Sequence, residues 1–393
     1  MPSPYRVLVL NQISANGLKR LPDDTYTSGK DIADPDAVLV RSADMHAMDI
    51  PSSVKAIGRC GAGTNNIPVK AMSARGVPVF NAPGANANAV KELVLAGMLM
   101  AARNLAPAQR FVDKLDPDAA DIDKTVEDGK KNFAGFELAG QTLGIIGLGK
   151  IGCLVADVAI KLGMNVLGYD PEITVDAAWS LPAQVKKAAS VNEVLRSANF
   201  ITVHVPLLEA TRDLVNEKNL ALVKPGSVLL NFSREGIAND AAVLAALEQG
   251  QLGWYVCDFP GQRILRHAKV IALPHLGAST REAEENCAIM VADQLRDFLE
   301  HGNVANAVNF PNVSMERESR FRVAIANANV PNMLGQISTA MAQAGLNIHN
   351  MVNKSRGDMA YTLVDVDSPA GDGVISALKQ IEGVLAVRYL PAP

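Results

Sequence analysis

The sequence lacks long apolar runs and shows no marked excess of charge of either sign. No stretch approaches the roughly 20 apolar residues that a membrane-spanning helix needs. Lysine and arginine number 37 against 41 aspartate and glutamate, a formal net charge of −4, so broad electrostatic binding of nucleic acid or anionic membrane is not expected. The 393 residues are 48% hydrophobic, which argues against a disordered chain and allows two or three domains.

Cysteine is also scarce. The four cysteines are scattered without CxxC spacing, and no pair of cysteines or histidines has the close spacing of a zinc site, so we expect no metal. The apolar stretch near the N-terminus, Val7 to Leu10, is too short for a signal peptide. We therefore expect free thiols in a reducing cytoplasm.

Short β-rich runs alternate with longer helical patterns, which predicts an α/β fold with parallel sheets. One such block precedes a long helical pattern over residues 86–104, and a second block begins at Gln141. Beyond residue 312 the order becomes β-α-β-β-α-β within about 70 residues, which is typical of a small ferredoxin-like domain.

A dinucleotide fingerprint opens the second block. Gly147 to Gly152 read GLGKIG, follow an apolar strand and begin a helical pattern, and Asp170 stands 18 residues beyond Gly152 at the end of the next strand. The glycines would let the pyrophosphate approach the backbone at the start of a helix. The Asp170 carboxylate would bind the adenosine ribose and repel a 2′-phosphate, which favours NAD over NADP.

Four further segments carry a family resemblance: RCGAGTNNIP (59–68), HVPLLEATRDLVN (204–216), NFSREG (231–236) and PHLGAST (274–280). With GLGKIG, their order and spacing resemble the D-2-hydroxyacid dehydrogenases, and the C-terminal block resembles an ACT domain. The resemblance implies two Rossmann-like domains plus a βαββαβ domain. It implies a discontinuous substrate-binding domain (1–92 and 280–312), an NAD-binding domain (93–279) and an ACT-like regulatory domain (313–393).

The combination is similar to the members that oxidise D-3-phosphoglycerate with NAD at the start of L-serine biosynthesis. By this resemblance Arg234 binds the substrate carboxylate and polarises the carbonyl, a task suited to a bidentate guanidinium. His275 is the acid and base, with an ordinary pKa near working pH. The cofactor set that the resemblance implies is Gly147, Gly149, Lys150, Ile151, Gly152, Asp170, His204, Val205, Pro206, Phe232, Ser233, Arg234, Asp258, His275, Gly277 and Ala278.

The sequence departs from the family where a glutamate normally pairs with the histidine. Aligned on Phe259, Gln262 stands in place of that glutamate, and Asp258 is displaced by one position from the usual aspartate. Either Gln262 orients His275, or Asp258 serves as its carboxylate partner. Loss of activity is a third reading, which the retained Arg234 and His275 oppose.

The substrate phosphate requires further cations. The resemblance assigns substrate binding to Arg41, Ser42, Arg59, Gly61, Ala62 and Gly63, all following strands of the first block. Together with Arg234 the two arginines would grip a phosphate and a carboxylate, which suggests closure around the substrate.

In the ACT-like block, Asn327, Asn329 and Asn347 match positions that bind an amino-acid effector, here L-serine. The usual glycine after Pro331 is replaced by Asn332, which leaves a dimerisation module without a ligand as the alternative. The resemblance also implies a homodimer or homotetramer. Two alternative functions stay open: a dehydrogenase of another D-2-hydroxy acid, such as D-lactate or 2-hydroxyglutarate, and an NADH-sensing binding protein without catalysis.

Overall fold

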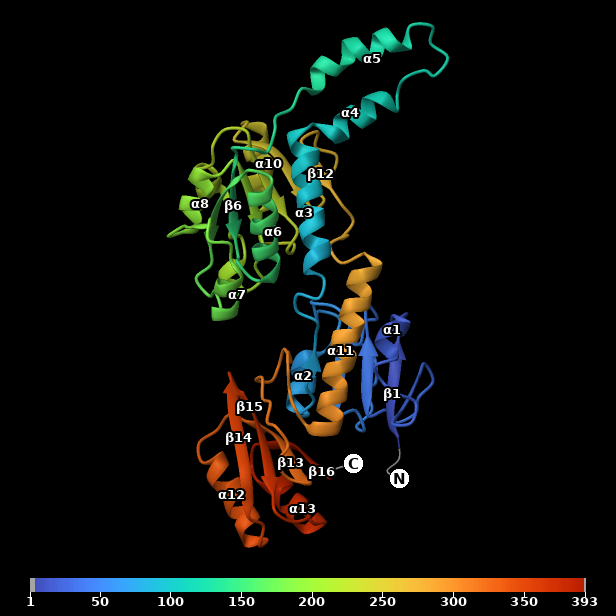
Figure 1. Ribbon diagram of the computed structural model, residues 1–393, viewed down its shortest axis with the longest axis vertical. Helices are drawn as coiled ribbons and strands as arrows, with labels where there is room; N and C mark the ends of the chain where they lie inside the picture. The colour runs from blue at the N-terminus through green and yellow to red at the C-terminus, as the bar shows by residue number, and fades with distance from the viewer. Residues whose placement is uncertain (1–3, 392–393) are drawn as a thin grey trace. The chain divides into compact units, whose positions relative to one another are not determined.

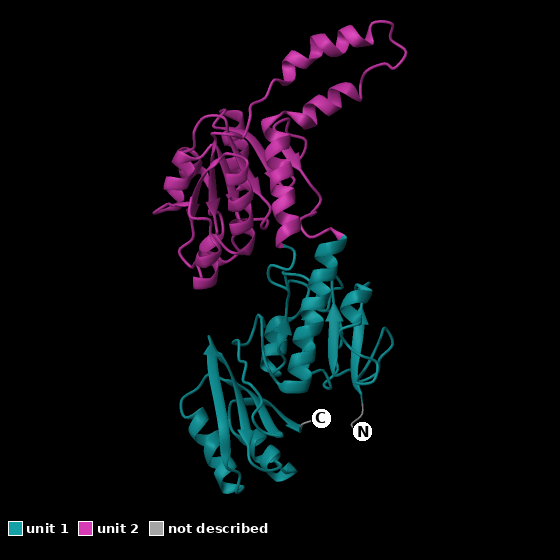
Figure 2. Ribbon diagram, in the orientation of Figure 1, with its two compact units in different colours: residues 1–86, 281–393 teal, residues 87–280 magenta. Residues whose placement is uncertain are grey.

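The computed structural model describes residues 4–391 and divides the chain into two compact units (Figure 2). Unit 1 joins Met1–Asn86 to Arg281–Pro393, and unit 2 is Ala87–Thr280. The first boundary lies a few residues before the predicted one. The ACT-like segment, predicted as a third domain, belongs to the same unit as the N-terminal segment. Among the residues described, no helix is both long and apolar enough to cross a bilayer.

The first half of unit 1 is a parallel sheet of order β2-β1-β3-β4-β5, the flavodoxin-like order of doubly wound folds. Its strands are nearly all apolar because both faces are covered. The long helix α11 packs against this sheet (Figure 1), with Val291 and Leu295 close to Gly58 of β4. The elements are β1 (Tyr5–Leu10), α1 (Ala15–Leu18), β2 (Tyr26–Gly29), β3 (Ala37–Val40), β4 (Ala56–Arg59), α2 (Val69–Ala74), β5 (Val79–Phe80) and α11 (Arg281–His301).

The second half of unit 1 is an antiparallel sheet of order β14-β15-β13-β16, with α12 and α13 against one face. This confirms the predicted ferredoxin-like arrangement. Its other face contributes Ala324, Leu363 and Leu390 to the core that contains α11, so the two halves share one hydrophobic core. The elements are β13 (Phe321–Ala328), α12 (Met333–Gln343), β14 (Ile348–Arg356), β15 (Met359–Val366), α13 (Asp372–Gln380) and β16 (Val384–Pro391).

Unit 2 is a seven-stranded parallel sheet of order β12-β11-β10-β9-β6-β7-β8, the dinucleotide-binding order with one further strand. Helices cover both of its faces (Figure 1). The strands are β6 (Thr142–Ile146), β7 (Asn165–Tyr169), β8 (Lys186–Lys187), β9 (Phe200–Val203), β10 (Ser227–Asn231), β11 (Leu252–Cys257) and β12 (Val270–Ala272). The helices are α3 (Ala87–Ala102), α4 (Leu105–Val112), α5 (Ile122–Lys130), α6 (Lys150–Lys161), α7 (Val175–Ser180), α8 (Val191–Ser197), α9 (Glu217–Leu220) and α10 (Asp240–Glu248), with short 3-10 turns at Lys131–Phe133 and Glu209–Thr211.

The C-terminal end of α11 is capped by side chains instead of by water. The last carbonyls of a helix have no partners within the helix and carry partial negative charge. Arg388 donates to the carbonyls of Phe298 (3.0 Å) and Leu299 (2.8 Å), and Tyr5 also donates to Leu299 (2.9 Å). Tyr361 donates to the carbonyl of Gly302 at 2.9 Å. The antiparallel sheet therefore holds the end of a helix that belongs to the parallel sheet.

A fully buried arginine completes this connection. Arg322 of β13 binds both carboxylate oxygens of Asp365 on β15, at 2.6 and 2.9 Å. Its remaining N–H groups donate to the carbonyls of His301, Met315 and Glu316 at 2.9 to 3.1 Å. All five donors of the guanidinium are thus used, which makes burial of this charge tolerable. One ion pair ties α11, the connecting segment and two strands together.

Removing the charge of Asp365 should destabilise unit 1 selectively. Asp365→Asn leaves the Arg322 cation buried without its counter-charge, which costs about 3–5 kcal/mol. Both tryptophans, Trp179 and Trp254, lie in unit 2, so urea unfolding followed by tryptophan fluorescence reports unit 2 while far-ultraviolet circular dichroism reports both units. We expect an early transition in the dichroism alone. The control is Asp358→Asn at an exposed turn; equal unfolding curves for the two variants would contradict this account.

Candidate active site

The predicted cofactor residues gather along one edge of the unit 2 sheet. They follow the carboxyl ends of β6, β7, β9, β10, β11 and β12, which are parallel and adjacent in the order found. In doubly wound folds the ligand crevice lies at this edge, where the chain switches from one side of the sheet to the other. Here that switch lies between β6 and β9.

The glycine loop after β6 is shaped to receive a ligand. Gly147 has φ of +95°, and a Cβ there would lie 2.5 Å from the carbonyl oxygen of His204, so only glycine fits. A Cβ on Gly152 would lie 2.1 Å from the carbonyl oxygen of Gly147, because loop and helix pack closely. At Gly149, by contrast, no atom of the protein lies within 4 Å of a Cβ. The second glycine therefore borders open space at the start of α6, where the backbone can approach a pyrophosphate.

Asp170 is held beside this loop. Its carboxylate accepts hydrogen bonds from the backbone N–H of Leu148 at 2.7 Å and of Glu172 at 2.9 Å. The carboxylate thus stands at the end of β7, next to the glycine loop, as binding of the adenosine ribose requires. These residues fit NAD, which would supply the nicotinamide ring that accepts or donates hydride.

His204 is electrically neutral at working pH. Burial lowers the pKa of its imidazole to about 3, and its Nε2 lies 3.0 Å from the hydroxyl oxygen of Thr202. This histidine follows β9 at the cofactor edge, but it cannot take up a proton near neutral pH. His204 therefore does not compete with His275 for the predicted role of acid and base.

Arg234 follows β10 in a loop that its neighbours fix. The Asn231 amide donates to the carbonyl of Arg234 at 3.0 Å and accepts from the backbone N–H of Ser233 at 3.1 Å. The Ser233 hydroxyl donates to the carbonyl of Val203 at 2.7 Å. Burial lowers the pKa of the Arg234 guanidinium from its usual value, although an arginine remains a cation there.

His275 sits in a strained loop that Asp258 supports. Its φ is +56°, a left-handed conformation that is uncommon for residues other than glycine. Its backbone N–H donates to the carbonyl of Asp258 at 3.1 Å. The Asp258 carboxylate, only 1% exposed, accepts from the N–H groups of Leu276 (2.7 Å) and Gly277 (2.8 Å). Asp258 therefore fixes the turn that begins at His275.

Phe259 brings the two predicted catalytic residues together. Its ring centroid lies 4.5 Å from that of the His275 imidazole and 5.9 Å from Cζ of Arg234. Phe259 was not among the predicted site residues. Its position directly after Asp258 is the signal in the sequence that points to a contact with the site.

The two predicted replacements for the missing glutamate lie in different surroundings. Gln262 is exposed, and within residues 4–391 its side chain makes no hydrogen bond. Asp258 is buried and bound to the loop of His275. Which of the two residues takes the role of the missing glutamate stays a prediction, and the observed contacts of Asp258 are to the backbone after His275.

The predicted substrate arginines lie in unit 1, at the carboxyl ends of β3 and β4. Arg41 forms an ion pair with Glu284 of α11 at 2.6 Å. The guanidinium of Arg59 lies against Gly61. A Cβ on Gly61 would be only 1.5 Å from Nη1 of Arg59. The carbonyl of Ala62 accepts a hydrogen bond of 2.6 Å from the side chain of Asn81. Ser42, Gly61, Ala62 and Gly63 all lie on the loops that follow these two strands.

The three predicted effector asparagines do not form one cluster within the chain. Asn327 pairs with Ala360, while Ile348, which follows Asn347, pairs with Val366 at the other end of the same ladder, about 20 Å away along the strands. Asn327 is 1% exposed and hydrogen-bonded to the carbonyl of Ala328 and to Thr362. Asn329 donates to the carbonyl of Gly357 at 3.0 Å. A site made of all three within one chain is therefore excluded.

The missing glycine after Pro331 has a structural explanation. Asn332 takes a φ of +62°, the left-handed conformation for which glycine is favoured and which asparagine tolerates best among the others. The turn into α12 is thus preserved with a different residue.

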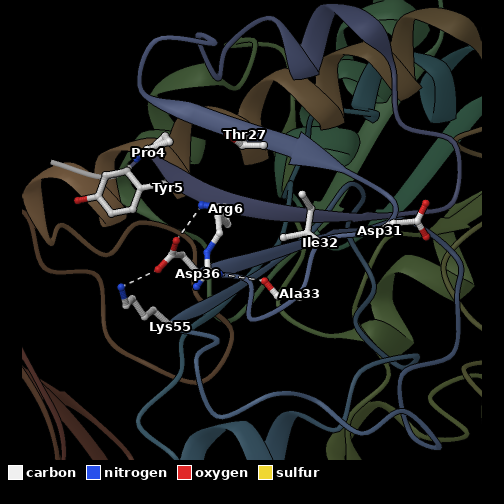
Figure 3. A pocket seen from close by; sticks show the side chains of 9 residues that line it. All are labelled: Pro4, Tyr5, Arg6, Thr27, Asp31, Ile32, Ala33, Asp36 and Lys55. Carbon is white, nitrogen blue, oxygen red and sulfur yellow. Dashed lines mark hydrogen bonds and ion pairs between the residues drawn. The ribbon is translucent and has the colours of Figure 1, made fainter. Parts of the chain in front are cut away.

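A separate hollow lies at the opposite, amino-terminal edge of the unit 1 sheet (Figure 3). Its charged groups bind one another: Asp36 accepts from the backbone N–H of Arg6 and from Lys55, both at 2.7 Å, and Arg6 donates to the carbonyl of Ala33. None of the predicted site residues lines it, so it is distinct from the candidate active site.

Residues 95–277 match the family model described as the NAD binding domain of the D-isomer specific 2-hydroxyacid dehydrogenases. The D-3-phosphoglycerate dehydrogenase of Haemophilus influenzae is 33% identical over 85% of this chain and 81% of its own length. That of Methanocaldococcus jannaschii is 35% identical over 85% of this chain but only 62% of its own length. The chain thus spans about three fifths of the length of some relatives.

Two solved structures share the fold. An apo D-mandelate dehydrogenase of Rhodotorula graminis has a TM-score of 0.67 at 22% identity, covering 77% of this chain and 97% of its own. A 3-phosphoglycerate dehydrogenase of Entamoeba histolytica with bound NAD+ has a TM-score of 0.61 at 24% identity, covering 78% and 99%.

The space beside Gly149 can be tested without any turnover. A methyl group in Gly149→Ala meets no protein atom but fills the space into which the pyrophosphate would pack. We expect NADH to bind at least about tenfold more weakly, roughly 1.4 kcal/mol, in a fluorescence titration, with an unchanged melting temperature. Gly373→Ala, which also meets no atom within 4 Å, is the matched control. Unaltered NADH affinity would show that the cofactor does not approach here.

Proposed function

Because the chain belongs to the D-isomer specific 2-hydroxyacid dehydrogenase family, we propose that it oxidises D-3-phosphoglycerate with NAD to 3-phosphohydroxypyruvate, the first step of L-serine biosynthesis. The names of its relatives support this substrate. The observation that carries the proposal is the placement of Arg234 and His275 about one aromatic ring at the cofactor edge of the sheet.

In this proposal Arg234 fixes the substrate and His275 handles the proton. The guanidinium binds the carboxylate through two parallel hydrogen bonds and polarises the oxygen on the neighbouring carbon. The His275 imidazole accepts the hydroxyl proton as hydride leaves the same carbon, and it returns the proton in the reverse direction. The nicotinamide carries the hydride. Asp258 binds the backbone of the loop that begins at His275, which has a left-handed conformation.

In this proposal the residues that bind the substrate phosphate belong to unit 1. Arg41 and Arg59 supply positive charge at the ends of two adjacent strands. The loop that contains Gly61, Ala62 and Gly63 adds backbone N–H groups. Two arginines suit a dianionic phosphate, whereas the second carboxylate of 2-hydroxyglutarate carries one charge and D-lactate has no second anionic group.

We extend the proposal to assembly and regulation. Helices α4 and α5 project from unit 2 as an arm (Figure 1), with Leu105, Val112 and Val126 exposed. A second copy that covers these side chains would form a homodimer, and light scattering of the purified chain measures its mass directly. Serine could contact Asn329 and Asn347 together only if two copies contributed one residue each, which pairing of the antiparallel sheets into a tetramer would allow.

The substrate assignment predicts a clear order of rates. NADH consumption should be fastest with 3-phosphohydroxypyruvate when pyruvate and 2-oxoglutarate are compared at equal concentration. Arg59→Ala should weaken use of the phosphorylated acid far more than use of the other two. Turnover of unphosphorylated acids alone would move the chain to another D-2-hydroxy acid. Tight NADH binding with no turnover would favour the NADH-sensing alternative.

Serine added to the same assay should slow turnover in the wild type and not in Asn347→Ala.

The two readings of the missing glutamate separate in the same assay. Asp258→Asn weakens the support of the loop of His275, so kcat should fall at least about tenfold, or 1.4 kcal/mol in the barrier. The Gln262→Ala substitution should lower kcat much less, because no hydrogen bond of the side chain is lost. NADH titrations of both variants control for cofactor binding. A larger fall in kcat for Gln262→Ala than for Asp258→Asn would instead make Gln262 the orienting residue.

A further inference from the structure

Arg41 does not stand alone at the end of its strand, because Glu284 holds it. Nη2 of Arg41 lies 2.6 Å from Oε1 of Glu284, in the first turn of α11. The two side chains are 35% and 39% exposed, so a ligand in solution can reach the pair. An acidic residue is also favourable in the first turn for the helix dipole, and this alone would explain its presence. The close contact with Arg41 adds a second role.

Arg41 directly follows strand β3, and hydrogen bonds fix the backbone after it, so the side chain is the part that can adjust. The Asn11 side chain accepts hydrogen bonds from the N–H groups of Ser42 (3.1 Å) and Ala43 (2.6 Å). The side chain of Asn66 donates to the carbonyl of Ala43 at 2.8 Å. The direction of the guanidinium is therefore determined by its ion pair with Glu284.

Glu284 also belongs to the same group of charges as Arg59. Two buried thiols, Cys60 and Cys287, lie within the field of both arginines. Burial raises the pKa of the Cys60 thiol to about 12, while Arg59 and Arg41 act to lower it. Burial raises the pKa of Cys287 as well, with the two arginines opposing and Glu284 reinforcing that shift. One carboxylate thus offsets part of the positive charge that the two arginines create.

We propose that Glu284 is a positioning and specificity-determining residue: it aims Arg41 and, by offsetting its charge, sets the affinity for the phosphate of the substrate. This inference rests on the proposed function. A phosphate dianion that contacts Arg41 must share the guanidinium with Glu284, so the carboxylate weakens phosphate binding while it keeps the arginine in place.

The two roles respond differently to two substitutions. Glu284→Gln retains an amide oxygen that can accept from Arg41 but removes the negative charge. Glu284→Ala removes both. We expect the glutamine variant to lower the KM for 3-phosphohydroxypyruvate about three- to tenfold, the effect of one charge several ångströms away near a surface. The KM of the alanine variant should lie above that of the glutamine variant, because the guanidinium is no longer aimed.

Two further measurements separate a charge effect at the phosphate from a general change. KM values for pyruvate should be equal in the wild type and in Glu284→Gln, because this acid has no phosphate. The lowering of the KM for 3-phosphohydroxypyruvate in Glu284→Gln should disappear near 1 M salt, because charges are then screened within about 3 Å. Glu285→Gln, which removes the same charge from the next position of the helix, is the matched control and should change KM less.

Inorganic phosphate tests the inference independently of turnover. Calorimetric titration of the intact protein with phosphate should show tighter binding to Glu284→Gln than to the wild type and loss of binding in Arg41→Ala. Unchanged or weaker phosphate binding in the glutamine variant would overturn the inference. Absence of a preference for the phosphorylated acid in the wild type would instead overturn the proposed function, and the phosphate titration would still decide the role of Glu284.

Discussion

The capping of α11 by the antiparallel sheet is the constraint on which unit 1 depends. A helix of 21 residues ends with carbonyl groups that need partners, and here Arg388, Arg322, Tyr5 and Tyr361 provide them. The same helix packs on the parallel sheet through its middle and places Glu284 beside Arg41 at its start. The C-terminal module is consequently part of the scaffold that supports Glu284 and Arg41. A ligand that shifted this sheet would move the end of α11 first.

In unit 2 the corresponding constraint is the pair of hydrogen bonds by which the Asp258 carboxylate fixes the turn at His275. Burial of a carboxylate costs free energy, even where it accepts two backbone N–H groups. We therefore expect Asp258 to fix a part of the structure that function requires. It holds a histidine in a left-handed conformation that few residues adopt without support. Phe259 then sets the imidazole and the Arg234 guanidinium about one ring. The departure from the usual family motif therefore leaves the two proposed catalytic residues, Arg234 and His275, on either side of Phe259.

Local patterns predicted the parts of this molecule that depend on local physics. The glycine loop, the alternation of strands and helices that gives parallel sheets, and the βαββαβ module follow from turn chemistry and periodicity, and all three were predicted. Contacts between distant residues could not be read in this way. Arg322 and Asp365 are 43 positions apart, and only the antiparallel pairing of β13 with β15 brings them together. The separation of Asn347 from Asn327 follows from the same register. The left-handed conformation of Asn332 likewise became visible only in the structure.

The proposed function depends above all on one property, oxidation of the D-enantiomer of a phosphorylated 2-hydroxy acid. In that proposal the carboxylate, the hydroxyl and the departing hydride meet Arg234, His275 and the nicotinamide together in only one handedness. The most direct measurement is the rate of NADH formation from NAD with D-3-phosphoglycerate and, separately, with its L-enantiomer. The account predicts turnover of the D-form and essentially none of the L-form. Equal rates with both, or turnover of the L-form alone, would contradict it.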